Sequence, residues 1–225
     1  LPVRHKDFHR NKTREFQRLV RKLQQYAVVN NAARFVCSNA TAKARSSVLA
    51  TSGTGRMLDA VTSIYGAKHR DMLQPVAFDD THACVRVAGL ISKALQGCGL
   101  SYGDRQMLFL NTRPVDVPKL SKAINEVYRQ YNAHQHPIYF LNIQLPPTAF
   151  DVNVTPDKRC IMFHNESALV EIVKARLKDL LEPSRGVMVV NTSVTEHFKR
   201  KGGLNSLPAT DDAVEGGLEE GGGVR

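Results

Sequence analysis

Strand-like and helix-like segments alternate along this chain, and that order limits the folds it can adopt. The stretch 139–145 places apolar residues at every second position, opposite Asn142 and Gln144, which indicates a strand with one buried face. Apolar residues recur every three or four positions before it, in 118–131, and after it, from Ser167 onward, which indicates helices. This order predicts an α/β or α+β fold in which helices pack on one sheet.

The other elements follow from the same patterns. A helix is expected over 12–26. Another is expected in MLDAVTSIYG, which begins after Thr54-Gly55 and ends at Gly66, a residue suited to a helix C-terminus. Short apolar or alternating runs predict the remaining strands, at 34–39, 76–78, 84–91, 106–110, 151–154 and 160–163.

The end of the chain differs from the rest in composition. Eight of the fifteen glycines follow Arg185, together with a single aromatic residue and the closing sequence EGGLEEGGGVR. Such a segment buries too little apolar surface to offset the entropy lost when a chain becomes ordered. We therefore predict one folded domain over 1–183 and a disordered, Gly-rich, acidic linker over 184–225.

The folded part is expected to be strongly basic. The formal net charge is +10 for the whole chain and −2 for the residues after Arg185, so the preceding residues carry +12. A positive field of this size favours a polyanionic partner, nucleic acid first. The sequence holds no apolar run of the roughly 18 residues that a membrane span needs, and its N-terminus lacks the apolar core of a signal peptide. We expect a soluble, unsecreted protein with no membrane partner.

Cysteine and histidine patterns give no ligand site. The four cysteines are far apart in the sequence, which favours buried, reduced thiols. The pair His134 and His136 lacks a third ligand at a suitable spacing, so no metal site is predicted. The glycine-rich SGTG, 52–55, lacks the lysine of a phosphate-binding loop and fits better as a loop before a helix.

A cationic face is expected on the helix over 12–26. Four basic residues fall within about 100° of one another around the helix axis: Arg14, Arg18, Arg21 and Lys22. The apolar set on the opposite side is Phe16, Leu19, Val20, Leu23 and Ala27. The first 22 residues hold eight Lys or Arg against two acids, which indicates contact with a phosphate backbone without base specificity. An ordinary solvated face is the alternative.

Two further cations stand at breaks between elements. Arg113 follows a strand in LNTRPVD, at a turn where its planar guanidinium could meet a phosphate, or could instead pair with Asp116. Lys158 stands in DVNVTPDKR, after Thr155-Pro156 interrupts an alternating stretch, so it presents a compact ammonium that suits a terminal phosphate. An ordinary surface lysine is the alternative there.

Taken together, these motifs resemble a known family. LPVRHKDFHRN, DRQMLFLNTRPVD with the following INEVY, and DVNVTPDKR occur in the order and spacing of the second half of the N-terminal ATPase region of MutL-type DNA mismatch-repair proteins. The combination of HKDF, NEVY and NVTPDKR is most similar to the eukaryotic post-meiotic-segregation (Pms) subunit. The resemblance runs from Leu1 to about Pro183.

The resemblance implies a fold for this chain and separate functions for this domain and an upstream one. The fold would be that of ribosomal protein S5 domain 2, a sandwich of one mixed sheet and helices with a left-handed βαβ crossover. This transducer domain would sense ATP and Mg²⁺ bound mainly by an upstream GHKL domain, with Lys158 reaching the γ-phosphate. Arg113, in the family's N-x-R turn, would contact duplex DNA. The motifs that build the ATP pocket and the metal-dependent endonuclease are absent from this sequence, so we expect the chain to be inactive by itself.

The same resemblance implies a nuclear protein that forms a heterodimer with a MutL homologue and works with a MutS-type mismatch-recognition complex. Two alternatives stay open from the sequence. One is the transducer of another GHKL enzyme, of the topoisomerase or chaperone type. The other is a basic RNA-binding protein with an S5-like fold.

Overall fold

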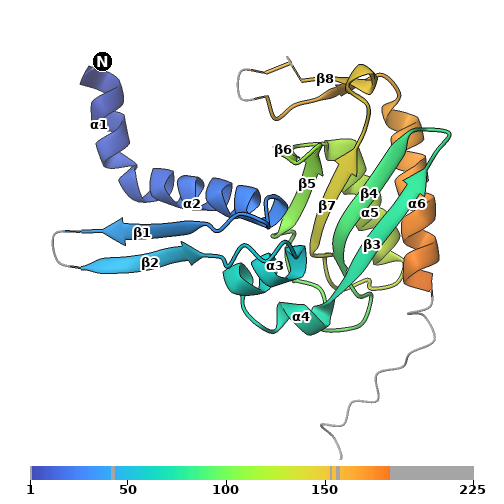
Figure 1. Ribbon diagram of the computed structural model, residues 1–225, viewed down its shortest axis with the longest axis horizontal. Helices are drawn as coiled ribbons and strands as arrows, with labels where there is room; N and C mark the ends of the chain where they lie inside the picture. Colours follow the sequence, from blue (N-terminus) through green and yellow to red (C-terminus); the bar gives the residue numbers. More distant parts are fainter. Residues whose placement is uncertain (1, 42–43, 153, 156–157, 183–225) are drawn as a thin grey trace, which may run out of the picture. The chain divides into compact units, whose positions relative to one another are not determined.

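A computed structural model describes residues 2–41, 44–152, 154–155 and 158–182 (Figure 1). All of these residues belong to one compact unit, Leu1–Val189. The predicted linker over 184–225 lies outside the described residues, and so does Pro183 at the end of the predicted domain.

A five-stranded mixed sheet forms the centre of the fold. Its strand order is β3-β4-β7-β5-β6, and the β5–β7 pair is parallel while the other neighbours are antiparallel. The strands are β3 (Leu73–Asp80), β4 (Val85–Ser92), β5 (Gln106–Leu110), β6 (Arg113–Val115) and β7 (Tyr139–Gln144). The expected α/β class with one mixed sheet is confirmed.

One face of the sheet is covered by two helices, α5 (Pro118–Arg129) and α6 (Glu166–Leu181). Parallel strands need a crossover, and α5 lies in the connection between β5 and β7. Both helices carry apolar residues at helical spacing, and these interlock with the sheet in the larger core; its innermost members include Ile91, Leu120, Ile124, Leu141, Val173 and Leu177. Asn165 caps α6 by accepting a hydrogen bond from the backbone N–H of Ala168.

The second face is partly covered by α2 (Lys12–Val29) and α3 (Met57–Tyr65). Val28 and Val61 from these helices pack with Phe109 and Phe140 of the sheet. Phe140 is fully buried, so the prediction that 139–145 has a single buried face is wrong at its start. The reason is that β7 is a central strand with helices on both sides, whereas alternation describes a strand that is covered on one side only. Gly66, at φ 100°, ends α3 as expected.

Several elements have no clear sequence signal. They are α1 (Pro2–Arg10), β2 (Arg45–Ala50), α4 (His69–Met72) and β6. The helix α1 is mostly polar, β2 reads RSSVLA, and β6 is three residues long and contains proline, so hydrophobic periodicity is weak in these three elements. Pairing with β1 (Val36–Ala40) makes β2 a strand, and pairing with β5 does so for β6.

The segment that carries Lys158 is more irregular than expected. A short 3-10 helix, Pro147–Ala149, leads into β8 (Phe150–Asp151), which pairs with β9 (Met162–Phe163). The predicted strand over 151–154 is wrong at Val152 and Val154, which lie outside any strand, and Asn153 is outside the described residues. The predicted burial of the cysteines is also wrong, since Cys84 and Cys160 are exposed and the two others are half-buried.

Candidate functional site

The turn between β5 and β6 is a two-residue hairpin with an unusual backbone. Leu110 pairs with Arg113, and the two residues between them, Asn111 and Thr112, both have left-handed φ values of 47° and 67°. Two such residues are typical of the tight turn whose twist matches that of a hairpin. Sequence reasoning treated Arg113 as part of the turn, but it is the first residue of β6.

Side chains tie this turn to the central strand β7. The Asn111 amide donates to the carbonyl of Leu145 at 2.9 Å and accepts from its N–H at 3.0 Å, as a strand residue would. The Thr112 N–H donates to the Asn142 side chain at 3.0 Å. These bonds hold the left-handed residues in place, so the position of the Arg113 backbone is fixed.

Arg113 is exposed at the start of the edge strand β6. Its guanidinium makes no hydrogen bond or ion pair with any residue that the structure describes. The alternative that Arg113 pairs with Asp116 is wrong, because Asp116 is held by another arginine, Arg159. Arg113 is thus placed where an external anion could reach it.

Arg159 makes a network that the sequence did not reveal. Its Nε and Nη2 donate to the two carboxylate oxygens of Asp116 at 2.7 and 2.8 Å, and its Nη1 donates to Gln25 Oε1 of α2 at 3.0 Å. The backbone N–H of Asp116 also donates to the Arg159 carbonyl at 3.0 Å. A planar guanidinium group suits such a bidentate contact with a carboxylate. These partners are 43 and 134 positions away in the sequence, so no local pattern could have indicated them.

Lys158 is exposed beside this network. Its φ is 52°, in the left-handed region, and its N–H donates to the Thr155 carbonyl at 2.9 Å in a tight turn. The ammonium makes no hydrogen bond or ion pair with residues in the described part of the chain. Pro156, which was expected to shape this turn, lies outside the described residues.

The helix α2 carries its cations outward. The predicted residues Arg14, Arg18, Arg21 and Lys22 are all exposed. Arg18 pairs with Glu15 at 2.6 Å, and this exposed pair leaves much of the Arg18 side chain open to solvent. The opposite face is less buried than expected, because Leu19 is 52% exposed. Leu19 instead lines a groove between the two N-terminal helices and β1.

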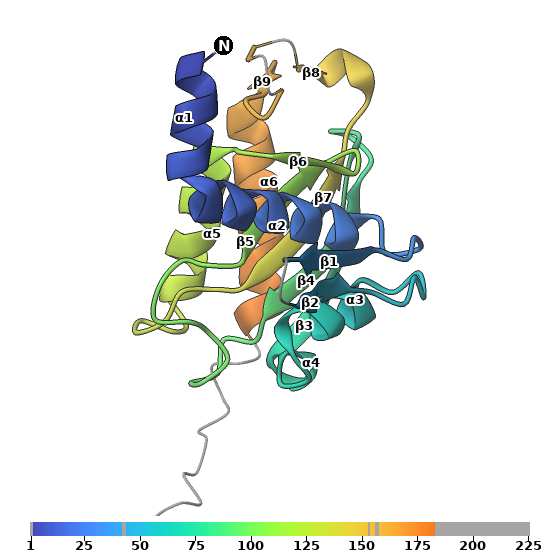
Figure 2. The ribbon, with the colours of Figure 1, turned by 90° about the vertical axis from the view of Figure 1, so that its left-hand side faces the viewer.

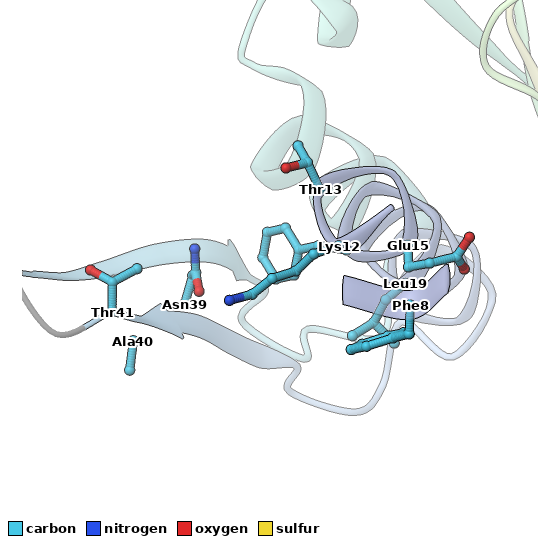
Figure 3. A pocket seen from close by; sticks show the side chains of 9 residues that line it. Phe8, Lys12, Thr13, Glu15, Leu19, Asn39, Ala40 and Thr41 are labelled. Atoms are coloured by element: carbon cyan, nitrogen blue, oxygen red, sulfur yellow. The ribbon is translucent and has the colours of Figure 1, made fainter. Parts of the chain in front are cut away.

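This groove has a volume of about 910 Å³. Figure 3 shows Phe8 and Leu19 close together on one side of it and Lys12 extending toward Asn39 of β1. Its other lining residues are Thr13, Glu15, Phe16, Ala40 and Thr41.

The candidate cations lie around the edge strand β6 and on the helix α2. The chain turns from β6 into the contact between Asp116 and Arg159, so Arg113 and the Lys158 segment lie toward opposite ends of β6. The helix α2 packs beside β6 and crosses the second face of the sheet (Figure 2). Among the described residues, no group of three or more His, Cys, Asp or Glu could hold a metal ion, and no described helix has the length and apolarity of a membrane span.

Comparison with known proteins identifies the class to which this fold belongs. A crystal structure of the N terminal domain of a DNA repair protein aligns with a TM-score of 0.72 and 37% identity, covering 81% of this chain and 58% of that one. The family model described as DNA mismatch repair protein, C-terminal domain, matches residues 61–182. The fold is therefore that of a DNA repair protein domain.

Similar curated proteins narrow the class. DNA mismatch repair protein PMS1 of Arabidopsis thaliana is 40% identical over 97% of this chain and 24% of that protein. Mismatch repair endonuclease PMS2 of Homo sapiens is 32% identical over 94% of this chain and 26% of that protein. This chain belongs to the MutL family of DNA mismatch-repair proteins and is similar to its Pms members. It spans about a quarter of the length of these relatives. Family membership decides against the topoisomerase or chaperone alternative.

Proposed function

We propose that this chain is the transducer and DNA-binding part of a MutL-type mismatch-repair ATPase. It would couple ATP binding in an upstream GHKL domain to domain closure and to duplex DNA binding. The observation that carries the proposal is the exposed Lys158 ammonium, which belongs to an anchored loop and has no partner among the described residues. An ammonium in such a place fits a phosphate.

The described residues fit a shared nucleotide site rather than a complete one. Lys158 supplies one cation toward the γ-phosphate, and ATP with Mg²⁺ would be held mainly by the upstream domain. A contact made with ATP but not with ADP favours one arrangement of the two domains, because a ligand shifts an equilibrium only by its differential affinity for the two states. Lys158 would supply that difference.

The experiment that tests this role is Lys158→Ala in the full-length protein. A charge-assisted hydrogen bond is worth about 1.5–3 kcal/mol, so we expect the ATP hydrolysis rate to fall about 10- to 100-fold. Lys178→Ala removes an exposed lysine from α6 and is the matched control, with an unchanged rate. If Lys158→Ala hydrolyses ATP at the wild-type rate, Lys158 has no part in the reaction.

The DNA-binding part of the proposal rests on Arg113 and the exposed cations of α2. We expect the chain to bind duplex DNA with little sequence preference and with an affinity that falls steeply as salt is added, since bound cations release counterions. The measurement is the slope of log affinity against log salt concentration. A flat response would contradict an electrostatic interface. Preference for A-form RNA in competition would favour the RNA-binding alternative.

The wider setting is also proposed. We propose that the protein acts in the nucleus as a heterodimer with a MutL homologue and together with a MutS-type mismatch-recognition complex. The support is its similarity to Pms proteins of plants, yeast and animals. Co-sedimentation of the purified full-length protein with a purified MutL homologue tests the heterodimer, and two independent boundaries at micromolar concentration would contradict it.

A further inference from the structure

Arg159 fixes the segment that presents Lys158. The two ends of the loop between β8 and β9 are held together, because Phe150 pairs with Phe163 and Asp151 with Met162. Just before β9, the Arg159 carbonyl accepts a hydrogen bond from the Asp116 N–H, and Asp116 also forms a parallel bridge with Cys160. The Arg159 side chain also binds the carboxylate of the same Asp116. Both the backbone and the side chain of the residue next to Lys158 are therefore anchored.

The Arg159 contact differs from an ordinary surface ion pair. All three guanidinium nitrogens donate, two to Asp116 and one to Gln25. The Arg159 side chain is only 16% exposed. Arg86 offers a comparison within the same chain, since it donates twice to Asp79 but is 64% exposed and merely joins the neighbouring strands β3 and β4. Arg159 instead joins three segments that are remote in sequence.

Lys158 needs such an anchor because of its own backbone. A residue other than glycine with φ near 52° is strained, and the surrounding structure must hold it there. The direction of the Lys158 side chain follows from this backbone. If the next residue were released, the loop would sample other conformations and the ammonium would no longer be held in one place.

The third partner connects this anchor to the cationic helix. Gln25 continues the line of Arg14, Arg18 and Arg21 with spacings of four, three and four residues. At 100° per residue these four side chains fall within about 60° of one another. The cationic line of α2 therefore ends at Gln25, whose side-chain amide oxygen accepts a hydrogen bond from Arg159.

We propose that Arg159 is a positioning residue that holds Lys158 toward the γ-phosphate, by fastening its loop to the junction of β6 and α5 and to α2. The inference rests on the proposed function of Lys158. Arg159 itself touches Asp116 and Gln25 rather than a ligand, so its effect on nucleotide binding passes through Lys158.

The test is the affinity of the full-length protein for ADP and for a non-hydrolysable ATP analogue, measured by titration calorimetry. Arg159→Ala weakens binding of the analogue about 10-fold, which is the size of one charge-assisted contact. The affinity for ADP stays unchanged, because ADP has no γ-phosphate. Gln25→Ala removes one of the three ties and produces a smaller loss in the same direction. Arg86→Ala, the matched control, changes neither affinity.

A second variant separates positioning from a general loss of structure. If Arg159 acts through Lys158, the double variant Lys158→Ala, Arg159→Ala binds the analogue no more weakly than Lys158→Ala alone. The inference would be overturned if Arg159→Ala reduced the affinities for ADP and for the analogue equally. It would also be overturned if the effects of the two substitutions on analogue affinity were fully additive in the double variant. An effect of Lys158→Ala without any effect of Arg159→Ala would overturn the inference while leaving the proposed function standing. No effect of Lys158→Ala would overturn the proposed function itself.

Discussion

At the scale of single residues, Asn111 shows how a side chain can take the place of backbone pairing. Its amide forms both hydrogen bonds that a strand neighbour would offer Leu145, while its own backbone has a left-handed φ of 47°. Asparagine tolerates this conformation better than most residues do. The N-x-R motif is therefore, in this structure, a hairpin turn followed by an exposed arginine.

Asn111→Ala removes both side-chain hydrogen bonds. It also leaves an alanine in the left-handed region, with no side-chain contact that compensates for the unfavourable backbone. We expect the free energy of unfolding to fall by about 2–3 kcal/mol, measured by urea denaturation of the chain. Asn111→Gly removes the same bonds but tolerates the backbone, so its loss is smaller. Stability within about 0.5 kcal/mol of wild type in Asn111→Ala would show that the turn does not depend on these bonds.

His69 is a second residue whose environment has a measurable consequence. It is fully buried, its Nδ1–H donates to the Gly66 carbonyl, and its Nε2 accepts from Arg105, which also stacks on Tyr65. Burial lowers the pKa of His69 from its ordinary value, and the positive charge of Arg105 lowers it further. The folded protein therefore keeps this ring neutral.

The unfolded chain takes up a proton at His69 below about pH 6.5, whereas the folded chain resists it. The unfolded state then binds more protons, so the free energy of unfolding falls as the pH drops below 6.5. Denaturation at several pH values between 8 and 5 measures this, and His69→Gln is expected to flatten the dependence while the exposed His82→Gln leaves it unchanged. An unchanged slope in His69→Gln would assign the effect to other groups.

At the scale of elements, the helix α2 has a buried C-terminal end and an exposed line of cationic side chains in its earlier turns. Ala27, Val28 and Val29 are buried at its C-terminal end, while its earlier turns present arginines to solvent. The groove beside Phe8 and Leu19 explains why the predicted apolar face is only half-buried. The helix can therefore lose charges in its first turns without losing its packing.

A triple variant of α2, Arg14, Arg18 and Arg21 each changed to Glu, is expected to weaken duplex DNA binding by at least about 100-fold at low salt and to flatten the salt slope. Arg176→Glu with Lys178→Glu on α6 reverses exposed charges on another element and is the control. Fluorescence anisotropy of labelled duplex DNA measures both. Equal losses in the two variants would mean that net charge, rather than α2, controls binding.

Sequence patterns predicted the elements with strong periodicity and missed those made by pairing. The helices α2, α3, α5 and α6 and the central strands carry enough apolar residues to be recognised alone. The strands β2 and β6 become strands only because β1 and β5 lie beside them. In the candidate site, local motifs led to the prediction of Lys158, Arg113 and the α2 cations, which stays a prediction. Arg159 was not predicted, because its partners come from distant parts of the chain.

At the scale of the whole molecule, the sheet edge at β6 connects Arg113, the Lys158 loop and the cationic helix α2. Arg113 begins β6, Asp116 follows it, and Arg159 links Asp116 to the cationic helix α2 and to the loop of Lys158. A nucleotide contact at Lys158 and a DNA contact on α2 would thus act on one connected set of residues. Such a set allows the two ligands to affect each other's affinity, and that coupling must be reciprocal.

The most direct measurement of this coupling is the affinity of the full-length protein for duplex DNA, determined at constant salt with ADP and with a non-hydrolysable ATP analogue. We expect tighter DNA binding with the analogue, by about 5- to 150-fold, the usual range of allosteric coupling. We also expect Lys158→Ala to remove this difference. Equal DNA affinity in the two nucleotide states of the wild-type protein would contradict the proposal that this chain is a transducer.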